Sequence, residues 1–581
     1  MRYNACGRQI EDSYPPKTKC RQGLSLASNL GHNLSVSENE TETTRPAPQT
    51  DQRHFFRGAT IIAGLTMLSR LFGLVREIAI NALGATQTMG AFRVAFAIPN
   101  LFRRLFGEGA ASAAFVPIFT EVAQKEGWDK ARALLANVAG LLAMLLGSIV
   151  IIGELVMLCV LIFAPQSALD AKQMGLVLQL TMIVLPFMLT VCLLAIASAA
   201  LNCKGHFAYP AFAPIMLNIF QIAAVMMLHM LDLGSSRAGL YLLCISVLVA
   251  GVAQLVGVVW LLKRFDLAAM LTIRPVLAPT RRVAALALPM LIPLGIMQFS
   301  AFFDRIYAHI LSGGTLGVGV VTWFETANRL YQFPMAILGI SLATAVFPLF
   351  SRYAADDDIA GLRSTVNRAL RLSLFMGIPA GAALFVLAEP TTAFVFRRKL
   401  FFTNDAIQSA WILQMYCIGM WAYFCNHILL RAFFAQKDTR TPLRVSVALA
   451  GVNMLLVGGL VFTPLKGGAM GLATAITASI STIIFTLILR SRWGEIGLRS
   501  IIVSLARILA ATTAMCAAII GVMYIMMGPL ETTTNTQAGF TLLVCIPGGI
   551  LVFMIVAWIL KATELTELRQ AIMHKSAKTE K

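Results

Sequence analysis

Long apolar stretches follow one another along most of the chain, and short polar loops separate them. Most are longer than the ~20 residues that a helix needs to cross a bilayer, and no ~10-residue segments of alternating hydrophobicity occur, as a membrane β-barrel would require. The pattern predicts an all-α integral membrane protein with about fourteen transmembrane helices. The predicted segments are 59–83, 89–119, 132–164, 174–201, 210–231, 238–262, 283–312, 317–350, 364–396, 406–435, 442–463, 468–489, 500–528 and 538–560.

The composition agrees with this pattern. Of the 581 residues, 58% are hydrophobic and 13% are charged, which is about half the charged fraction of a soluble domain. This balance excludes an ordinary soluble enzyme, a coiled coil and a disordered chain. Residues 1–57 are polar and lack the apolar core of a signal peptide, so they predict a disordered cytoplasmic tail. The cysteines form no CxxC pair, which indicates buried hydrophobes rather than a zinc or disulfide framework.

The basic residues favour one side of the membrane. If the N-terminus is cytoplasmic, the loops after even-numbered helices hold 19 Lys and Arg residues, and the other loops hold six. The positive-inside rule then places both termini in the cytoplasm. The loop residues also account for the net charge of +19 without a nucleic-acid partner. One cluster, Arg397–Lys399, lies on the opposite side and breaks the rule.

Two pairs of short motifs recur at nearly the same spacing. Because this spacing covers an even number of helices, it predicts two parallel, pseudo-symmetric six-helix lobes followed by two C-terminal helices. The motif pairs are Ala200–Lys204 with Ala432–Gln436, at an offset of 232, and Phe115–Phe119 with Val346–Phe350, at an offset of 231. The predicted parts are the tail (1–57), an N-lobe (58–264), a C-lobe (265–492), the last helix pair (493–562) and a cytoplasmic C-terminal tail (563–581).

Charged side chains inside the predicted spans are the candidate functional groups. A charge at the bilayer centre costs at least ~2.5–3.5 kcal/mol, so it should face a cavity or a partner. Guanidinium groups bind two phosphate oxygens at once and stay charged when desolvated, which favours an anion-binding cavity between the lobes. The alternative is internal pairing, or a position at the membrane interface. The charged positions in the first, second and eighth spans are Arg70, Arg76, Glu77, Arg93, Arg103, Arg104, Glu108, Glu325 and Arg329.

No P-loop, GxSxG or HExxH motif occurs, so we expect neither an enzyme nor a bound cofactor or metal. Transport would then draw on a gradient, a membrane potential or consumption of the substrate. Two further groups lie within spans. Asp304 and Arg305 are expected to neutralise each other, and Glu154 is either a span-end residue or a proton site.

Five motifs of the chain are distinctive: Ser69-Arg-Leu-Phe-Gly-Leu-Val-Arg-Glu77, Pro99-Asn-Leu-Phe-Arg-Arg104, Phe106-Gly-Glu-Gly-Ala110, Asn328-Arg-Leu-Tyr-Gln-Phe-Pro334 and Asp438-Thr-Arg-Thr-Pro442. They resemble motifs of the MurJ (MviN) family of lipid II flippases, in the multidrug/oligosaccharidyl-lipid/polysaccharide exporter superfamily. The resemblance implies fourteen helices, two lobes around a cationic cavity, and a multi-pass protein of the bacterial inner membrane. It also implies alternating access that moves an undecaprenyl-diphosphate-linked disaccharide-pentapeptide, lipid II, from the inner to the outer leaflet.

The resemblance also implies roles for particular residues. The substrate-binding arginines of the family map onto Arg70, Arg76, Arg103 and Arg329. Lipid II and membrane lipids are then the partners, a monovalent counter-ion is a candidate, and the last two helices form a groove for the lipid tail. The residues expected to support binding or gating are Glu77, Arg93, Arg104, Glu108, Glu325 and Asn328.

Three positions depart from the family pattern. Gly90 and Asn328 stand where a carboxylate is common, and Arg93 stands where an apolar residue is usual. These changes question any gating ion pair that needs those acids, but they leave the anion-binding arginines intact.

The alternatives to a lipid II flippase are a related polysaccharide-lipid flippase, a cation-coupled drug exporter, or a membrane scaffold without transport. A drug exporter should favour carboxylates and aromatic residues in its cavity, because its substrates are usually cationic.

Overall fold

The computed structural model describes residues 49–107, 110–310, 312, 317–528, 530 and 532–567, and these residues form helices without any β-strand. The predicted tail of residues 1–57 lies almost entirely outside this range, as does most of the tail at 563–581. Within the described residues, ten helical segments are long and apolar enough to cross a membrane, and the bent pair formed by residues 403–435 makes an eleventh if it is one span. The all-α membrane fold is therefore confirmed. Each predicted segment is helical, but a total of fourteen crossings stays a prediction.

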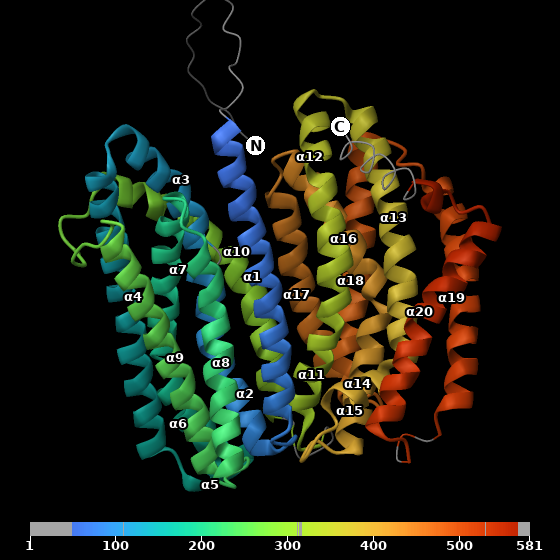
Figure 1. Ribbon diagram of the computed structural model, residues 1–581, viewed down its shortest axis with the longest axis horizontal. Helices are drawn as coiled ribbons and strands as arrows, with labels where there is room; N and C mark the ends of the chain where they lie inside the picture. The colour runs from blue at the N-terminus through green and yellow to red at the C-terminus, as the bar shows by residue number, and fades with distance from the viewer. Residues whose placement is uncertain are drawn as a thin grey trace, which may run out of the picture. The chain divides into compact units, whose positions relative to one another are not determined.

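The helices follow the predicted segments, and several segments hold two or three helices in succession (Figure 1). We keep N-lobe and C-lobe as names for the predicted parts 58–264 and 265–492. The helices of the predicted N-lobe are α1 (Gln49–Asn81), α2 (Gln87–Phe102), η1 (Arg103–Gly107), α3 (Ala110–Lys125), α4 (Trp128–Phe163), α5 (Gln166–Asp170), η2 (Ala171–Gln173), α6 (Met174–Val184), α7 (Phe187–Cys203), α8 (Ala208–Met230) and α9 (Arg237–Arg264). The C-lobe contains α10 (Ala278–Ile310), α11 (Val320–Pro334), η3 (Met335–Ile340), α12 (Ser341–Ala355), α13 (Ile359–Val386), α14 (Ala388–Phe396), α15 (Thr403–Ile418), α16 (Met420–Ala435), α17 (Arg440–Leu460) and α18 (Gly468–Trp493). The last pair is α19 (Leu498–Met526) and α20 (Asn535–Ile559).

Helix α10 packs against helices of both predicted lobes. Its neighbours are α2 and α3 of the N-lobe and α17 of the C-lobe. Arg282, near the start of α10, forms an ion pair with Glu121 of α3 at 2.7 Å. The first helix of the predicted C-lobe, α10, thus forms part of the contact with the N-lobe.

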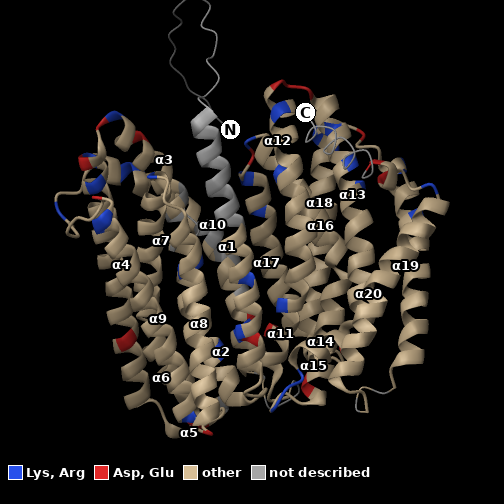
Figure 2. Ribbon diagram, viewed as in Figure 1, with Lys and Arg blue, Asp and Glu red and all other residues tan. Residues whose placement is uncertain are grey.

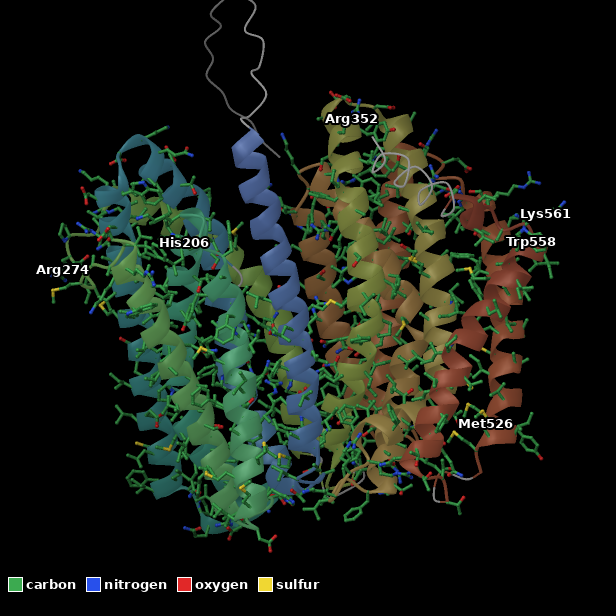
Figure 3. The ribbon with its side chains drawn as sticks, in the orientation of Figure 1. His206, Arg274, Arg352, Met526, Trp558 and Lys561 are labelled. Carbon is green, nitrogen blue, oxygen red and sulfur yellow. The ribbon has the colours of Figure 1, made fainter. Side chains whose placement is uncertain are left out.

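The two ends of the helices differ in charge. Lys and Arg gather at the end where α3 and α12 finish and α13 begins (Figure 2). Arg352 and Lys561, both predicted to be cytoplasmic, lie at this end, whereas Met526 lies at the other (Figure 3). We call these the basic end and the turn end. The side of the membrane that each end faces stays a prediction.

Two helices of the candidate site break shortly after a proline. Pro99 lies within α2, which continues directly into the π-helical turn η1, and Pro334 ends α11 before the π-helix η3. Proline has no N–H to donate and its ring crowds the preceding turn, so it disrupts a regular helix. At the first break, Asn100 Nδ2 donates to the carbonyl of Phe96 at 3.1 Å. The first break therefore begins at Arg103, and the second begins six residues after Arg329.

The Arg397–Lys399 cluster, which departs from the positive-inside pattern, has a structural use. Arg397 Nε donates to Asn535 Oδ1 at 2.7 Å, and its Nη1 donates to the carbonyl of Leu530 at 2.9 Å. The remaining Nη2 bonds the carbonyl of Thr533, and Asn535 Nδ2 returns a bond to the Arg397 carbonyl at 2.7 Å. These bonds fasten the turn between α19 and α20 to the C-lobe.

A second set of contacts fastens the same helix pair at the basic end. Arg371 of α13 binds Glu564 at 3.2 Å and Glu567 at 2.9 Å, and the buried Glu564 accepts from Ser504 of α19 at 2.7 Å. Because α19 and α20 are held at both ends, they form one packed unit with the C-lobe.

We expect Arg397→Ala to loosen the α19–α20 turn. Hydrogen bonds to a charged donor contribute ~1.5–3 kcal/mol each, so amide hydrogen exchange across residues 532–537 should rise about tenfold or more. Mass-spectrometric exchange on the purified protein measures this rate. Arg398→Ala is the matched control, since the bond from Arg398 Nη2 to the Phe394 carbonyl is long, at 3.5 Å. Equal effects of the two variants would contradict the assignment.

Candidate functional site

Three arginines surround the carboxylate of Glu77, which lies on α1 with only 7% of its side chain exposed. Arg93 Nη1 lies 2.8 Å from Glu77 Oε1, while Arg76 and Arg329 approach Oε2 at 3.6 Å and 3.7 Å. Arg329 belongs to α11, so the group spans both lobes. One carboxylate facing three guanidinium groups leaves an excess of two positive charges. We call these four residues the Glu77 cluster.

Asn81 extends the cluster by one helical turn. Its Oδ1 accepts from Arg93 Nη2 at 2.5 Å, and its Nδ2 donates to Thr326 Oγ1 of α11 at 3.0 Å. Thr326 in turn donates to the carbonyl of Thr322 at 2.8 Å. Sequence reasoning missed Asn81 and Thr326 because neither is charged. The available signal was spacing, since Asn81 follows Glu77 by four residues and therefore shares its helix face.

The lobes also meet through their backbones at the turn end, beside the Glu77 cluster. The Leu400 amide donates to the Ala82 carbonyl at 3.3 Å. Gly84 has a positive φ of 97°, and a Cβ at this position would lie 3.2 Å from the Leu400 carbonyl oxygen. A Cβ on Gly319 would lie 2.8 Å from the Ala85 carbonyl oxygen. Glycine at these two positions therefore permits the close approach of the lobes.

Arg70 and Arg103 lie further toward the basic end. Arg70 is exposed on α1, seven residues before Glu77 and thus ~10 Å away along the helix axis. The chain reverses between α1 and α2, so Arg103, ten residues beyond Arg93, lies in the same direction at ~15 Å. Arg103 Nε donates to Asn100 Oδ1 at 3.2 Å. The predicted substrate-binding arginines thus form a series along the helices and do not converge on one point.

The supporting residues have separate positions. Arg104 donates to Gln298 of α10 at 3.2 Å, and Asn328 accepts from Gln332 of its own helix at 2.9 Å. Glu325 forms an ion pair with Arg305 that joins α11 to α10. Glu108 lies outside the described residues. A small group of charged segments around α1, α2 and α11, away from the basic end, corresponds to this region in Figure 2.

Among the three positions that depart from the family pattern, Arg93 has the closest contact with the Glu77 cluster. The sequence indicates a cation gained where an apolar residue is usual, which questions the gating ion pairs. The structure places Arg93 at the shortest ion pair of Glu77, with its side chain 7% exposed. Gly90, the lost carboxylate, is buried, and a Cβ there would make ordinary contacts with His309 and Val321. With no carboxylate at position 90, Glu77 is the acid that pairs with the three arginines of the cluster.

Comparison with known proteins gives a consistent result. The family model described as Lipid II flippase MurJ matches residues 79–538. Lipid II flippase MurJ of Burkholderia cenocepacia is 33% identical over 449 residues, which cover 76% of this chain and 84% of the relative. Probable lipid II flippase MurJ of Rhizobium meliloti is 30% identical over 520 residues, covering 88% of this chain and 95% of the relative.

Two solved structures share the fold. A lipid II flippase MurJ in an inward closed conformation has a TM-score of 0.67 at 22% identity, covering 86% of this chain and 98% of the other. An inward-facing multidrug resistance MATE family transporter has a TM-score of 0.60 at 14% identity, covering 75% and 98%.

A double-mutant cycle should detect strong coupling between Arg93 and Glu77. Removing one partner of a buried pair leaves an uncompensated charge, so we expect a coupling free energy of about 2 kcal/mol or more for Arg93→Met with Glu77→Gln. Unfolding of the purified protein in mixed detergent measures it. The exposed pair Arg132–Asp129, at 3.2 Å, is the control and should couple by less than ~0.5 kcal/mol. Coupling at the control level would refute the central position of Arg93.

Proposed function

The chain belongs to the lipid II flippase MurJ family, as its sequence motifs predict, and we propose that it moves lipid II from the inner to the outer leaflet of the bacterial cytoplasmic membrane. The polar part of this substrate is an undecaprenyl-linked diphosphate with a disaccharide-pentapeptide. Carrying such groups bare through hydrocarbon is prohibitive, because each buried unpaired polar group costs several kcal/mol. The membrane protein must therefore replace the water around the diphosphate.

The observation that carries the proposal is the excess positive charge of the Glu77 cluster where the lobes meet. Arginine suits diphosphate because its planar fork forms two parallel hydrogen bonds to phosphate oxygens. Arg329 is the member best placed for substrate, since 41% of its side chain is exposed while Glu77 is almost fully covered. Arg70 and Arg103, which precede the cluster from the basic end, would receive the diphosphate first.

Alternating access supplies the transport step in this proposal. The lobes are joined at the turn end by the Glu77–Arg329 and Asn81–Thr326 contacts. With both termini in the cytoplasm, the turn end faces the periplasm, so this arrangement is closed toward the outer side. Release of the head group outside then requires these contacts to part. A monovalent counter-ion remains a candidate for the driving force.

An apolar groove fits the tail of a lipid substrate. It has a volume of about 270 Å³ and lies among α13, α15, α16 and α19. Its lining residues include Phe385, Ile418, Trp421 and Cys516, and none of the residues that line it is charged. Because α19 contributes Cys516, the groove supports the expected role of the last helix pair in holding the tail. The head group and the tail would then contact different parts of the C-lobe.

A cation-coupled drug exporter is the second candidate, and the same cluster disfavours it. Cationic drugs call for carboxylates in the cavity, whereas three arginines here share one. The likeness to a MATE family transporter shows only the fold. Membership of a flippase family likewise indicates a transporter rather than an enzyme.

We expect Arg329→Ala to impair transport strongly without loss of protein. Losing a charge-assisted contact worth ~1.5–3 kcal/mol should reduce flipping about tenfold or more. The measurement is the amount of lipid II accessible on the outer face of cells that depend on the variant, compared with inner-leaflet lipid II. Arg132→Ala, on the exposed pair with Asp129, is the control. Normal export by the Arg329 variant would remove this residue from the site, and absence of any lipid II transport by the unaltered chain would end the proposal.

We expect Ala382→Trp, which fills the groove, to impair transport in a tail-dependent manner. Ala382 lines the groove on α13. Flipping of lipid II with its full undecaprenyl tail into reconstituted vesicles should fall several-fold, while an analogue with a two-isoprene tail should be much less affected. Leu455→Trp on the exposed face of α17 serves as the control. An equal loss for both tail lengths would place the tail elsewhere.

A further inference from the structure

A second ion pair lies one helical turn from the Glu77 cluster. Glu325 of α11 binds Arg305 of α10, and both side chains are mostly buried, at 22% and 16% exposed. Glu325 precedes Arg329 by four residues, so the two side chains share one face of α11. A carboxylate four residues before a cation is the favourable order for a pair within a helix. Arg329 therefore has a second carboxylate within reach on its own helix.

On the C-lobe side, the charges around Arg329 balance. Arg305 and Arg329 are matched in number by Asp304, the neighbour of Arg305 in the chain, and by Glu325. On the N-lobe side, Glu77 keeps Arg93 at 2.8 Å even without Arg329. If the lobes part, neither lobe needs to expose an unpaired buried charge, provided that Arg329 can move to Glu325.

We propose that Arg329 exchanges carboxylates during transport: it binds Glu77 while the turn end is closed, and Glu325 when that end opens. Arg305 releases Glu325 in the open state and falls back on Asp304. Glu325 and Arg305 are thus positioning residues, acting through Arg329. This exchange deepens the proposed function. It rests on that function in one respect only, namely that the opening serves to release lipid II.

The geometry indicates which contact breaks. Arg329 approaches Glu77 at 3.7 Å, compared with 2.8 Å for Arg93, and it is the most exposed of the arginines in the cluster. The longer, more solvated pair is the weaker one. A charge left without a partner in the membrane interior is strongly disfavoured, so the opening is practicable only with a replacement partner. Glu325 supplies that partner without movement of the α11 backbone.

Amide exchange at Leu400 reports the opening directly, because its N–H donates to the Ala82 carbonyl across the lobes. The experiment compares exchange of peptides containing Leu400 in the full chain, in lipid nanodiscs without substrate. Glu325→Gln removes the fallback partner of Arg329, so exchange should slow at least about threefold. Arg305→Gln leaves Glu325 free to attract Arg329, so exchange should speed up by a similar factor. The double variant should behave like Glu325→Gln, because Arg329 again lacks a fallback.

The matched control is Glu495→Gln, which removes an exposed pair with Arg490 and should leave the exchange unchanged. If the Arg305–Glu325 pair were purely structural, both single variants would change the Leu400 exchange rate in the same direction, and the double variant would match either one. That result would overturn the proposal. No change in any variant would overturn it as well. Opposite signs without lipid II transport by the unaltered chain would support the exchange and refute the proposed function. If both single variants changed the exchange rate in the same direction while transport depended on Arg329, the carboxylate exchange would be refuted and the proposed function supported.

Discussion

A single buried carboxylate, Glu77, holds arginines from both lobes, and the rest of the site depends on this sharing. A charge in the membrane interior requires a partner, so Glu77 draws Arg93 from α2 and Arg329 from α11 to one place. The same contact closes the turn end and leaves more positive than negative charge beside it. In the proposed function, closure and anion binding thus both depend on Arg329. An anion that competes for Arg329 would then weaken the closure, and this competition would link substrate binding to the movement of the lobes.

The helix breaks and the fastened helix pair fit this arrangement. Both π-helical segments lie close to predicted substrate-binding arginines, since η1 begins at Arg103 and η3 begins six residues after Arg329. The α19–α20 pair is held to the C-lobe by Arg397 at one end and Arg371 at the other. In the proposed function, the groove for the tail and the arginine for the diphosphate then move together, and the lipid is carried without separate release of its two parts.

Hydropathy predicted all fourteen helical segments, because apolar length is a local property of the sequence. The grouping of Arg76, Glu77 and Arg329 was also predictable from the cost of burying charge. Arg93 was expected to support binding or gating, but the sequence could not name its partner, because Glu77 lies on another helix and meets Arg93 only when the fold brings α1 and α2 together. Asn81 and Thr326 carry no charge, and only the spacing of Asn81 from Glu77 pointed to a shared helix face. Arg70 and Arg103, predicted to bind substrate together with Arg329, lie apart from it because the helical rise spreads these residues along the helix axes.

The central claim is that arginines of both lobes replace water around a diphosphate. Cryo-electron microscopy of the full chain with lipid II in nanodiscs tests it most directly. The account predicts diphosphate density within hydrogen-bond distance of Arg329 and at least one N-lobe arginine, with Glu77 further from Arg329 than the 3.7 Å found here. Diphosphate density away from both lobes' arginines, with the Glu77 cluster unchanged, would contradict it.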